Sequence, residues 1–320
     1  MNASDAHDVI ARAVRSPDDG ARIAYVARRA RGVEAAPSAP IVLFVNGLSN
    51  HCFQLSALAN DRAGRGAWAV EYDFRGHGSS ENPKIPSRTS AVSFARDAWA
   101  VVDDFASASG TRAGRIDVVA YSFGVRVAME MVRQRRDGVR LLVAVLGSPE
   151  RILDGLLGRR LADVAVAAGD VLGARAMTVL VRTALTLAAT APRFIWALAR
   201  VLGLLRSSYR AFEPFFAHLR RLDAETWVRC VLDGHKTSAM DMWTDENRNW
   251  RVACIAGDRD FAAPLTVMRS WEKYTDFFWM LKGVAHDGLR SHGASILALT
   301  REAFDRVDEM EKVQIRRNTR

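Results

Sequence analysis

Cysteine is scarce in this chain, with 3 residues among 320. Their odd number and wide spacing exclude a disulfide framework and a zinc knuckle. There is also no H-E-x-x-H pair and no glycine loop that could cradle a phosphate, so we expect neither a metal ion nor an organic cofactor. The amino terminus, with Asp5 and Asp8, does not have the pattern of a secretory signal. The predicted location is therefore a reducing cytoplasm.

Long hydrophobic runs are also missing. In the most apolar region, the longest stretch free of charged residues is the ten residues from Thr183 to Pro192. A membrane-spanning helix needs about 18 or more apolar residues, so the sequence predicts no transmembrane helix. The overall composition, with 49% hydrophobic and 25% charged residues, is that of a globular chain.

Acidic residues are too few to balance the basic ones, and the net charge is +9. Such a charge raises the question of a polyanionic partner. The 40 arginines and 5 lysines, however, are spread from Arg12 to Arg320 with no basic arm. Aromatic residues are not interleaved with them as a base-stacking platform requires. We therefore do not expect nucleic-acid binding.

Four mostly apolar runs predict strands that are buried on both faces. They are residues 41–45, 67–72, 116–120 and 141–146. Helical patterns at 90–109 and 123–136 lie between them, so strands and helices alternate as in a parallel sheet. A Pro and Gly turn at 16–20 predicts a hairpin over 12–28, and a linker is expected at 35–40.

The alternation stops after residue 147. Residues 148–249 contain no strand-like run, and Pro192 is expected to separate two helices there. The alternation then resumes with strands at 251–256 and 277–281 and helices at about 264–274 and 294–311. We therefore predict one α/β core, residues 1–147 and 250–320, with an all-helical insertion of residues 148–249.

A serine lies between a predicted strand and a predicted helix, in the sequence Ala120-Tyr121-Ser122-Phe123-Gly124. Strand and helix cross so closely at such a turn that only small residues fit two positions before and after the serine. The pentapeptide resembles the nucleophile elbow of the α/β-hydrolase family, with Ala120 where the first glycine usually stands. The resemblance implies a mostly parallel central sheet flanked by helices, with Ser122 as the nucleophile.

A serine hydroxyl needs a base to take its proton, and the base needs an acid to orient it. In the α/β-hydrolase family the acid and then the histidine follow the serine. Residues 257–264 resemble the family's G-x-x-D-x-x-x-P turn, which favours Asp260 as the acid, with Asp258 as the alternative. The sequence Gly-Val-Ala-His that ends at His286 resembles the histidine turn, and His292 is the alternative base.

Acyl transfer also needs donors for the oxyanion, usually two backbone N–H groups. The resemblance assigns one donor to Phe123 and the other to Leu48, in a loop where Asn46 replaces the usual histidine. A further stretch that begins at Asp73 resembles the family's D-x-R-G-x-G-x-S loop. Its role in the family is mainly structural, and we expect Asp73 and Arg75 to tie that loop down.

The insertion has an unusual charge pattern. Between Asp170 and Glu213 there is no acidic residue, but there are six arginines, at 175, 182, 193, 200, 206 and 210. In the α/β-hydrolase family an insertion at this place forms a cap over the active site. A cap this apolar predicts a pocket for a hydrophobic small molecule. Its arginine-only polar residues raise the hypothesis of a peripheral contact with an anionic membrane.

Together these resemblances imply a cofactor-independent serine hydrolase that cleaves a carboxylic ester with an apolar acyl or aryl group. A thioesterase, a lactonase or a carbon–carbon bond hydrolase would use the same residues, because fold and triad do not fix the substrate. Epoxide hydrolases and haloalkane dehalogenases of the family carry aspartate at the elbow, so Ser122 argues against alkyl-enzyme chemistry. A non-hydrolytic cyclase or binding protein is the alternative of another class.

Overall fold

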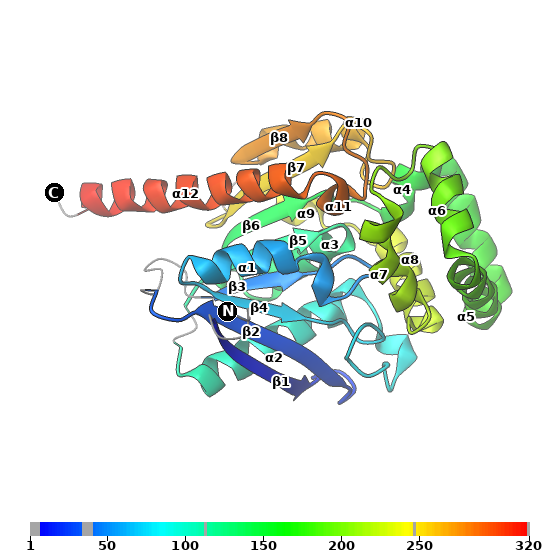
Figure 1. The fold of residues 1–320 in the computed structure, drawn as a ribbon, viewed down its shortest axis with the longest axis horizontal. Helices are drawn as coiled ribbons and strands as arrows, with labels where there is room; N and C mark the ends of the chain where they lie inside the picture. Colours follow the sequence, from blue (N-terminus) through cyan, green and yellow to red (C-terminus); the bar gives the residue numbers. More distant parts are fainter. Residues whose placement is uncertain (1–6, 34–40, 112–113, 246–247, 319–320) are drawn as a thin grey trace.

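The computed structural model describes residues 7–33, 41–111, 114–245 and 248–318. The linker predicted at 35–40 lies outside the described residues. The described chain forms a sheet with helices on both faces, and a group of helices at one end of the sheet (Figure 1).

The eight strands are β1 (His7–Arg15), β2 (Arg22–Ala30), β3 (Ile41–Val45), β4 (Trp68–Tyr72), β5 (Ile116–Tyr121), β6 (Val139–Val145), β7 (Arg251–Gly257) and β8 (Phe277–Leu281). Their order in the sheet is β1-β2-β4-β3-β5-β6-β7-β8. The hairpin β1–β2 and the pair β2–β4 are antiparallel, and all other neighbours are parallel. The predicted mostly parallel sheet is confirmed.

Helices cover both faces of this sheet. On one face lie α2 (Ala91–Ser109) and α3 (Phe123–Gln134), and on the other lie α1 (Ser56–Gly64) and α12 (Gly293–Asn318). Successive residues of β3 contribute alternately to the two cores, and all of them are fully buried. This two-sided burial is the reason why the strand is apolar at every position.

Short helices make most of the remaining connections. They are η2 (Cys52–Gln54), η3 (Pro86–Arg88), α10 (Leu265–Ser270), η4 (Glu272–Tyr274) and α11 (Gly288–Ser291). The single helix predicted at 264–274 is therefore two short helices, α10 and η4. The last helix continues to residue 318, beyond the predicted end at 311, and projects from the sheet at the end opposite the helical insertion (Figure 1).

The chain between β6 and β7 is helical. Its helices are α4 (Ile152–Leu157), α5 (Arg159–Thr190), α6 (Pro192–Val201), α7 (Tyr209–Leu219), α8 (Ala224–Lys236) and α9 (Met240–Trp243). As expected, α5 ends just before Pro192, because proline lacks the N–H that would continue the helix. A second break was not expected. Gly173 has φ 79° and ψ 154°, a conformation open almost only to glycine, and it divides α5 into two parts.

The sequence predicts no transmembrane helix, but by length and composition alone helix α5 is long and apolar enough to cross a membrane. An 18-residue window of this helix has a mean hydropathy of 1.7, and only 11% of that window is buried. A search for runs without charged residues is interrupted at Arg175 and Arg182. The mean hydropathy of an 18-residue window can stay high although the window contains charged residues. The break at Gly173 nonetheless leaves two parts, each shorter than the roughly 20 residues that a straight spanning helix needs.

Candidate active site

Ser122 lies in the sharp turn that joins β5 to α3. Its backbone has φ 54° and ψ −123°, which is strained for a residue with a side chain. A Cβ at Gly124 would lie 2.3 Å from the carbonyl oxygen of Val45, so only glycine fits there. The steric requirement inferred from the sequence is therefore present, and the turn presents the Ser122 side chain to a cavity.

The structure brings the three predicted residues Ser122, His286 and Asp260 together. Oγ of Ser122 lies 2.8 Å from Nε2 of His286. Nδ1 of His286 lies 3.0 Å and 2.9 Å from the two carboxylate oxygens of Asp260. Because Nδ1 faces a carboxylate, Nδ1 carries the proton and donates a hydrogen bond to Asp260. Nε2 is then free to accept the hydroxyl proton of Ser122.

The two alternative residues lie elsewhere. Oδ1 of Asp258 accepts a hydrogen bond from the backbone N–H of Gly283 at 2.6 Å, so Asp258 holds the turn that leads to His286. Nδ1 of His292 lies 3.0 Å from Oγ of the neighbouring Ser291. The geometry favours Asp260 and His286, because these are the residues in contact with each other and with Ser122.

The carboxylate of Asp260 is held in place by the turn after β7. Its Oδ1 accepts hydrogen bonds from the backbone N–H groups of Ala262 at 2.8 Å and Ala263 at 2.9 Å. Burial by itself lowers the pKa of His286, but the charge and hydrogen bond of Asp260 more than offset it. The pKa of His286 therefore lies above its ordinary value, which suits a group that gains a proton during a reaction.

Leu48 and Phe123, the predicted oxyanion donors, line the same cavity as Ser122 and His286. Phe123 is the first residue of α3, and the first N–H groups of a helix have no partner within it. The loop after β3 runs directly beside the serine, since a Cβ at Gly47 would lie 3.0 Å from Cβ of Ser122. The donors and the serine therefore surround one space.

Asn46, which replaces the histidine usual in the family, starts this loop. Its side chain is buried, and Nδ2 donates a hydrogen bond to the carbonyl oxygen of Tyr72 at 3.4 Å. Asn46 therefore joins the ends of the neighbouring strands β3 and β4. This contact keeps the first residue of the loop against the sheet.

Ser49 follows Leu48 in the loop after β3, and its φ is 68°. It is held by two residues that the sequence did not assign to the site. Trp227 Nε1 donates to Oγ of Ser49 at 2.7 Å, and the N–H of Ser49 donates to Nε2 of His77 at 3.3 Å. Nδ1 of His77 in turn lies 3.0 Å from the carbonyl oxygen of Arg75. Burial lowers the pKa of His77, so the neutral ring can accept at Nε2. His77 and Trp227 thus position the chain one residue after Leu48.

The histidine turn is also held from two directions. The hydroxyl of Tyr121 donates to the carbonyl oxygen of His286 at 2.6 Å. Asp287, the next residue, is buried, and its Oδ2 accepts hydrogen bonds from the N–H groups of Arg206 at 2.9 Å and Ser207 at 2.7 Å. The base is therefore connected to the nucleophile's strand on one side and to the helical insertion on the other.

The loop after β4 is tied down as the family resemblance implied. Arg75 is fully buried, and its guanidinium lies 2.7 Å from a carboxylate oxygen of Asp97 and 3.0 Å from one of Asp19. The carboxylate of Asp73 accepts hydrogen bonds from backbone N–H groups of two loops. These contacts fix the loop that carries His77.

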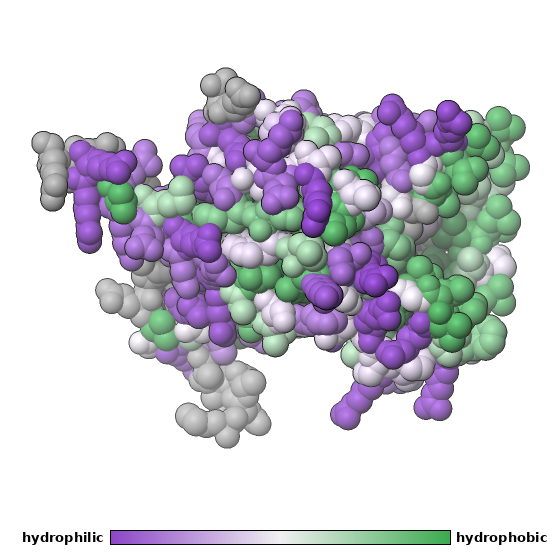
Figure 2. Space-filling model, turned by 90° about the horizontal axis from the view of Figure 1, so that it is seen from above, coloured by the Kyte–Doolittle hydropathy of each residue, from purple (hydrophilic) through white to green (hydrophobic). Residues whose placement is uncertain are grey.

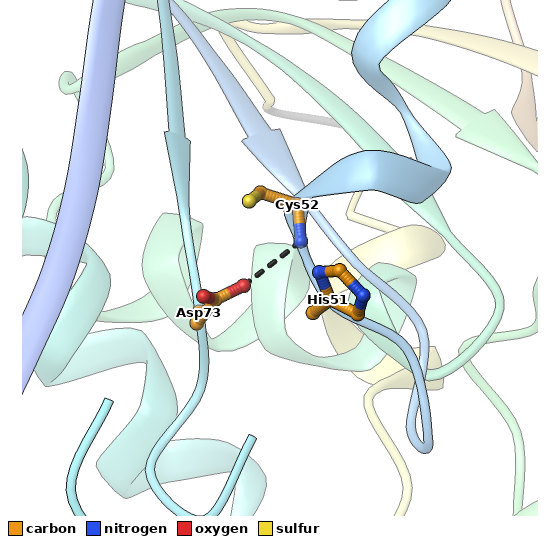
Figure 3. Close-up of side chains that lie close together, drawn as sticks. All are labelled: His51, Cys52 and Asp73. Atoms are coloured by element: carbon orange, nitrogen blue, oxygen red, sulfur yellow. Dashed lines mark hydrogen bonds between the residues drawn. The ribbon is translucent and has the colours of Figure 1, made fainter. Parts of the chain in front are cut away.

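A group of metal-ligand side chains also lies near this loop (Figure 3). One ligand atom each of His51, Cys52 and Asp73 lies within 4.8 Å of the others. The oxygens of Asp73, however, already accept from the N–H groups of Cys52 and Ser79, each at 2.8 Å. Burial raises the pKa of Cys52 to about 12, so its sulfur stays a neutral thiol. We therefore assign these residues to the architecture of the loop.

A cavity of about 300 Å³ lies in front of Ser122 and His286. This is at the lower end of the range for small-molecule pockets, roughly 300–1,000 Å³. Its apolar lining residues include Leu48, Ile152, Trp227, Val231, Phe261 and Val267. Three of these, from α4 and α8, belong to the helical insertion. The insertion therefore supplies one wall of the cavity and the sheet domain the other.

Several solved structures have a similar fold. An esterase from Thermogutta terrifontis has a TM-score of 0.68 and 15% identity, covering 93% of this chain and 99% of its own. A bromoperoxidase from Bacillus anthracis has a TM-score of 0.69 and 12% identity, covering 92% and 100%. An epoxide hydrolase from Vigna radiata has a TM-score of 0.66 and 18% identity, covering 94% and 98%. At these identities the likeness is one of fold alone.

A comparison with curated proteins found no match. The model of the Alpha/beta hydrolase family, in contrast, matches residues 42–299. This match covers most of the chain and extends from strand β3 to beyond His286. The chain belongs to the alpha/beta hydrolase family.

Proposed function

We propose that this protein is a cofactor-independent serine hydrolase that cleaves a carboxylic ester with an apolar acyl or aryl group. The observation that carries the proposal is the hydrogen-bonded chain from Ser122 through His286 to Asp260 at the edge of an apolar cavity. Binding alone would not require a nucleophile, a base and an acid in this order.

In the first half of the reaction Oγ of Ser122 attacks the carbonyl carbon of the ester. Nε2 of His286 takes the hydroxyl proton, and Asp260 stabilises the imidazolium that forms. The backbone N–H groups of Phe123 and Leu48 bind the negative oxygen of the tetrahedral intermediate. When that intermediate collapses, His286 gives its proton to the departing alcohol, and an acyl group stays on Ser122.

In the second half a water molecule takes the place of the alcohol. His286 removes a proton from the water as its oxygen attacks the acyl carbon, and the same two N–H groups bind the oxyanion again. Collapse of the second intermediate returns the proton to Oγ of Ser122 and releases the carboxylic acid. One water molecule and the residues of the chain balance these steps.

The cavity supports an apolar substrate. Its walls are mostly aliphatic and aromatic side chains, and its volume of about 300 Å³ suits a short or medium acyl group. A thioester or a lactone would fit the same reacting groups. Ser122 supports an acyl-enzyme in preference to the alkyl-enzyme that an elbow aspartate would form.

A fluorophosphonate probe tests the proposal directly, because it reacts with a serine that has an activating base. We expect covalent labelling of the native chain and none of Ser122→Ala. Ser148 lines the same cavity, so Ser148→Ala is the matched control and should label normally. A panel of esters, thioesters and lactones of rising chain length then identifies the substrate class. A folded chain that neither labels nor hydrolyses any of them would overturn the proposal and favour a binding protein.

A further inference from the structure

The helical insertion exposes much more hydrophobic surface than the rest of the protein. Among the described residues, 12 of the 20 exposed large hydrophobic side chains lie between Leu157 and Leu202. We call these twelve the apolar cap surface: Leu157, Leu161, Val164, Val171, Leu172, Val179, Leu180, Leu187, Phe194, Leu198, Val201 and Leu202. Figure 2 shows hydrophobic residues gathered at the end of the molecule where Figure 1 places α5 and α6.

The exposure of these side chains is unusually high. Val171 is 88% exposed, Val201 is 85% exposed and Phe194 is 67% exposed. Single exposed hydrophobic residues are common on soluble proteins, but a large contiguous group of them marks an interaction site. The apolar cap surface therefore has the character of an interaction surface.

Arginines run beside the hydrophobic residues on both helices. On α5, Arg175 and Arg182 are seven residues apart, and exposed Val179 lies between them at helical spacing, so all three share one side. On α6, Arg193 and Arg200 have the same spacing. Long arginine side chains can lie along apolar surface while the guanidinium reaches a polar layer.

A similar spacing holds for the hydrophobic residues of α6. Phe194, Leu198 and Val201 lie at positions i, i+4 and i+7, so they form one exposed stripe next to the stripe of Arg193 and Arg200.

Among the described residues, none of the six arginines from 175 to 210 forms an ion pair with a carboxylate. Arg200, however, donates hydrogen bonds to the carbonyl oxygens of Arg206 and Ser207. The guanidinium groups of Arg193 and Arg200 also lie over the rings of Tyr209 and Trp196. The exposed guanidinium groups of Arg175 and Arg182 are therefore the ones most accessible to an external anion.

The polar contacts of α5 show how the helix lies. Its first part is held by charged residues outside it: Asp170 binds Nζ of Lys236 on α8 at 2.7 Å, and Asp163 binds Arg151. The helix also packs along α8. A helix held in this way, and broken at Gly173, is suited to lie in the plane of an interface with one face outward.

We propose that the apolar cap surface docks on an anionic lipid membrane. The hydrophobic side chains of α5 and α6 enter the boundary between headgroups and acyl chains, and the arginines beside them bind lipid phosphates. Charge complementarity selects this partner, because a stretch with six arginines and no acidic residue needs a negative surface. The proposal concerns binding and does not depend on the chemistry of Ser122.

A second copy of the chain fits this surface less well. A two-fold contact would place the same patch against itself, so residues 175–210 of one subunit would face the same residues of the other. The contact would bring arginines against arginines with no carboxylate between Asp170 and Glu213 to separate them. Like charges that face one another across an interface oppose association.

Docking would also place the cavity close to lipid. Helix α5 packs against α8, and α8 supplies the cavity residues Trp227 and Val231. One side of the insertion would then contact the membrane, and the other side would cover Ser122.

Vesicle flotation with the full chain tests the proposal. We expect the protein to float with vesicles of equimolar phosphatidylcholine and phosphatidylglycerol, and to stay in solution with phosphatidylcholine alone. High salt should weaken the binding, since it screens the arginine charges. Equal flotation with both vesicles, or none with either, would overturn the proposal.

Matched variants locate the surface. Arg182→Gln should weaken binding to the anionic vesicles about fivefold, whereas Arg269→Gln, the same charge change on exposed α10, should leave it unchanged. Val201→Ser should weaken binding about tenfold, whereas Val313→Ser on exposed α12 should have no effect. Circular dichroism checks that each variant is folded. Equal effects of cap and control variants would contradict the assigned surface.

Two other outcomes would replace the proposal. Sedimentation velocity could show a concentration-dependent dimer that Val201→Ser abolishes, without flotation, and the partner would then be a second copy. Protein that stays in the membrane after alkaline carbonate treatment would show that α5 spans the bilayer instead of lying on it.

Discussion

The sheet domain and the helical insertion use hydrophobic residues in opposite ways. Every residue of β3, β4, β5 and β6 is buried. The 32-residue helix α5 buries only Ala162, Val166, Gly169 and Ala189, and α6 buries none of its residues. Apolar sequence therefore stabilises the fold in one region and is left available for contact in the other. Composition alone does not distinguish these two uses.

Charged residues show the same contrast. In the sheet domain two buried arginines are paired with buried carboxylates: Arg75 with Asp97, and Arg140 with Asp117. In the insertion, the described arginines from 175 to 210 have no such carboxylate. Removing a charge should therefore destabilise the sheet domain and leave the stability of the insertion almost unchanged. The predictions below test whether chemistry and stability belong to one region and surface contact to the other.

The largest expected effect is on the reaction. Ser122→Ala should lower turnover of an ester substrate by about 10⁶-fold, or about 8 kcal/mol of transition-state stabilisation, because the three residues act as a unit. Vesicle binding should not change, since Ser122 lies under the insertion. Steady-state kinetics and flotation on the same preparation measure both. A loss of less than tenfold would contradict the role of Ser122.

The next largest effect is expected from a change at Asp260, the proposed acid. Asp260→Asn should lower kcat by about 10⁴-fold, because an amide favours the wrong tautomer of His286. Asp258→Asn is the matched control, and it should cost far less, since the carboxylate of Asp258 bonds to the backbone N–H of Gly283, whereas that of Asp260 bonds to His286. Comparable losses for both variants would show that the choice between the two aspartates is wrong.

The buried ion pair of Arg140 and Asp117 lies near the end of β5 that is away from Ser122, so it tests stability separately from the reaction. Arg140→Met should lower the free energy of unfolding by about 3–5 kcal/mol, because it leaves the fully buried carboxylate of Asp117 without its partner. Denaturant titration measures this loss. The double variant Arg140→Met/Asp117→Leu should recover most of it. A double variant as unstable as the single one would show that the pair is not the cause.

The pH dependence follows from the raised pKa of His286. Only the neutral imidazole can accept the proton of Ser122, so kcat/KM should fall tenfold per pH unit on the acid side. The midpoint should lie above 6.5, the ordinary value, because Asp260 favours the protonated form. The contribution of His286 to the free energy of unfolding has the opposite pH dependence. The protonated ring favours the folded state below its unfolded pKa, and this contribution is lost as pH rises through the raised pKa. A rate that is flat to pH well below 6.5 would contradict His286 as the base.

The smallest effect should come from the apolar cap surface. Val171→Ser should change the free energy of unfolding by less than about 0.5 kcal/mol, because this side chain already faces water. The same change at fully buried Val143 should cost about 2–4 kcal/mol. Thermal or denaturant unfolding of the pair measures the contrast. Equal losses would mean that residue 171 is packed in solution.

The sequence predicted the strands and the order of the site residues well, because both depend on local pattern. A continuous apolar run such as residues 41–45 has few alternatives to a buried strand, and the turns that carry Ser122, Asp260 and His286 each follow such a run. The structure brings these three side chains together, and their roles in the reaction remain predictions until they are measured.

The supporting contacts could not be predicted in the same way. Trp227 and Ser49 are 178 residues apart, and no local pattern indicates that one side chain holds the other. His77 lies in the loop after β4, whose predicted role is mainly structural, and its contact with the N–H of Ser49 becomes visible only when two loops are folded together. The break at Gly173 had a local signal, a glycine within a helical stretch, although tertiary structure decides whether such a glycine ends a helix.

The two hydrogen bonds from Arg206 and Ser207 to Asp287 limit how the cavity can open. Bonds to a charged group contribute about 1.5–3 kcal/mol each, so a departure of the whole insertion would be costly and would drag the residue next to His286. A movement of the insertion that keeps both hydrogen bonds and leaves the imidazole in place would therefore pivot at residues 206–207. Helices α5 and α6 would then rotate about residues 206–207, which would stay in place beside His286.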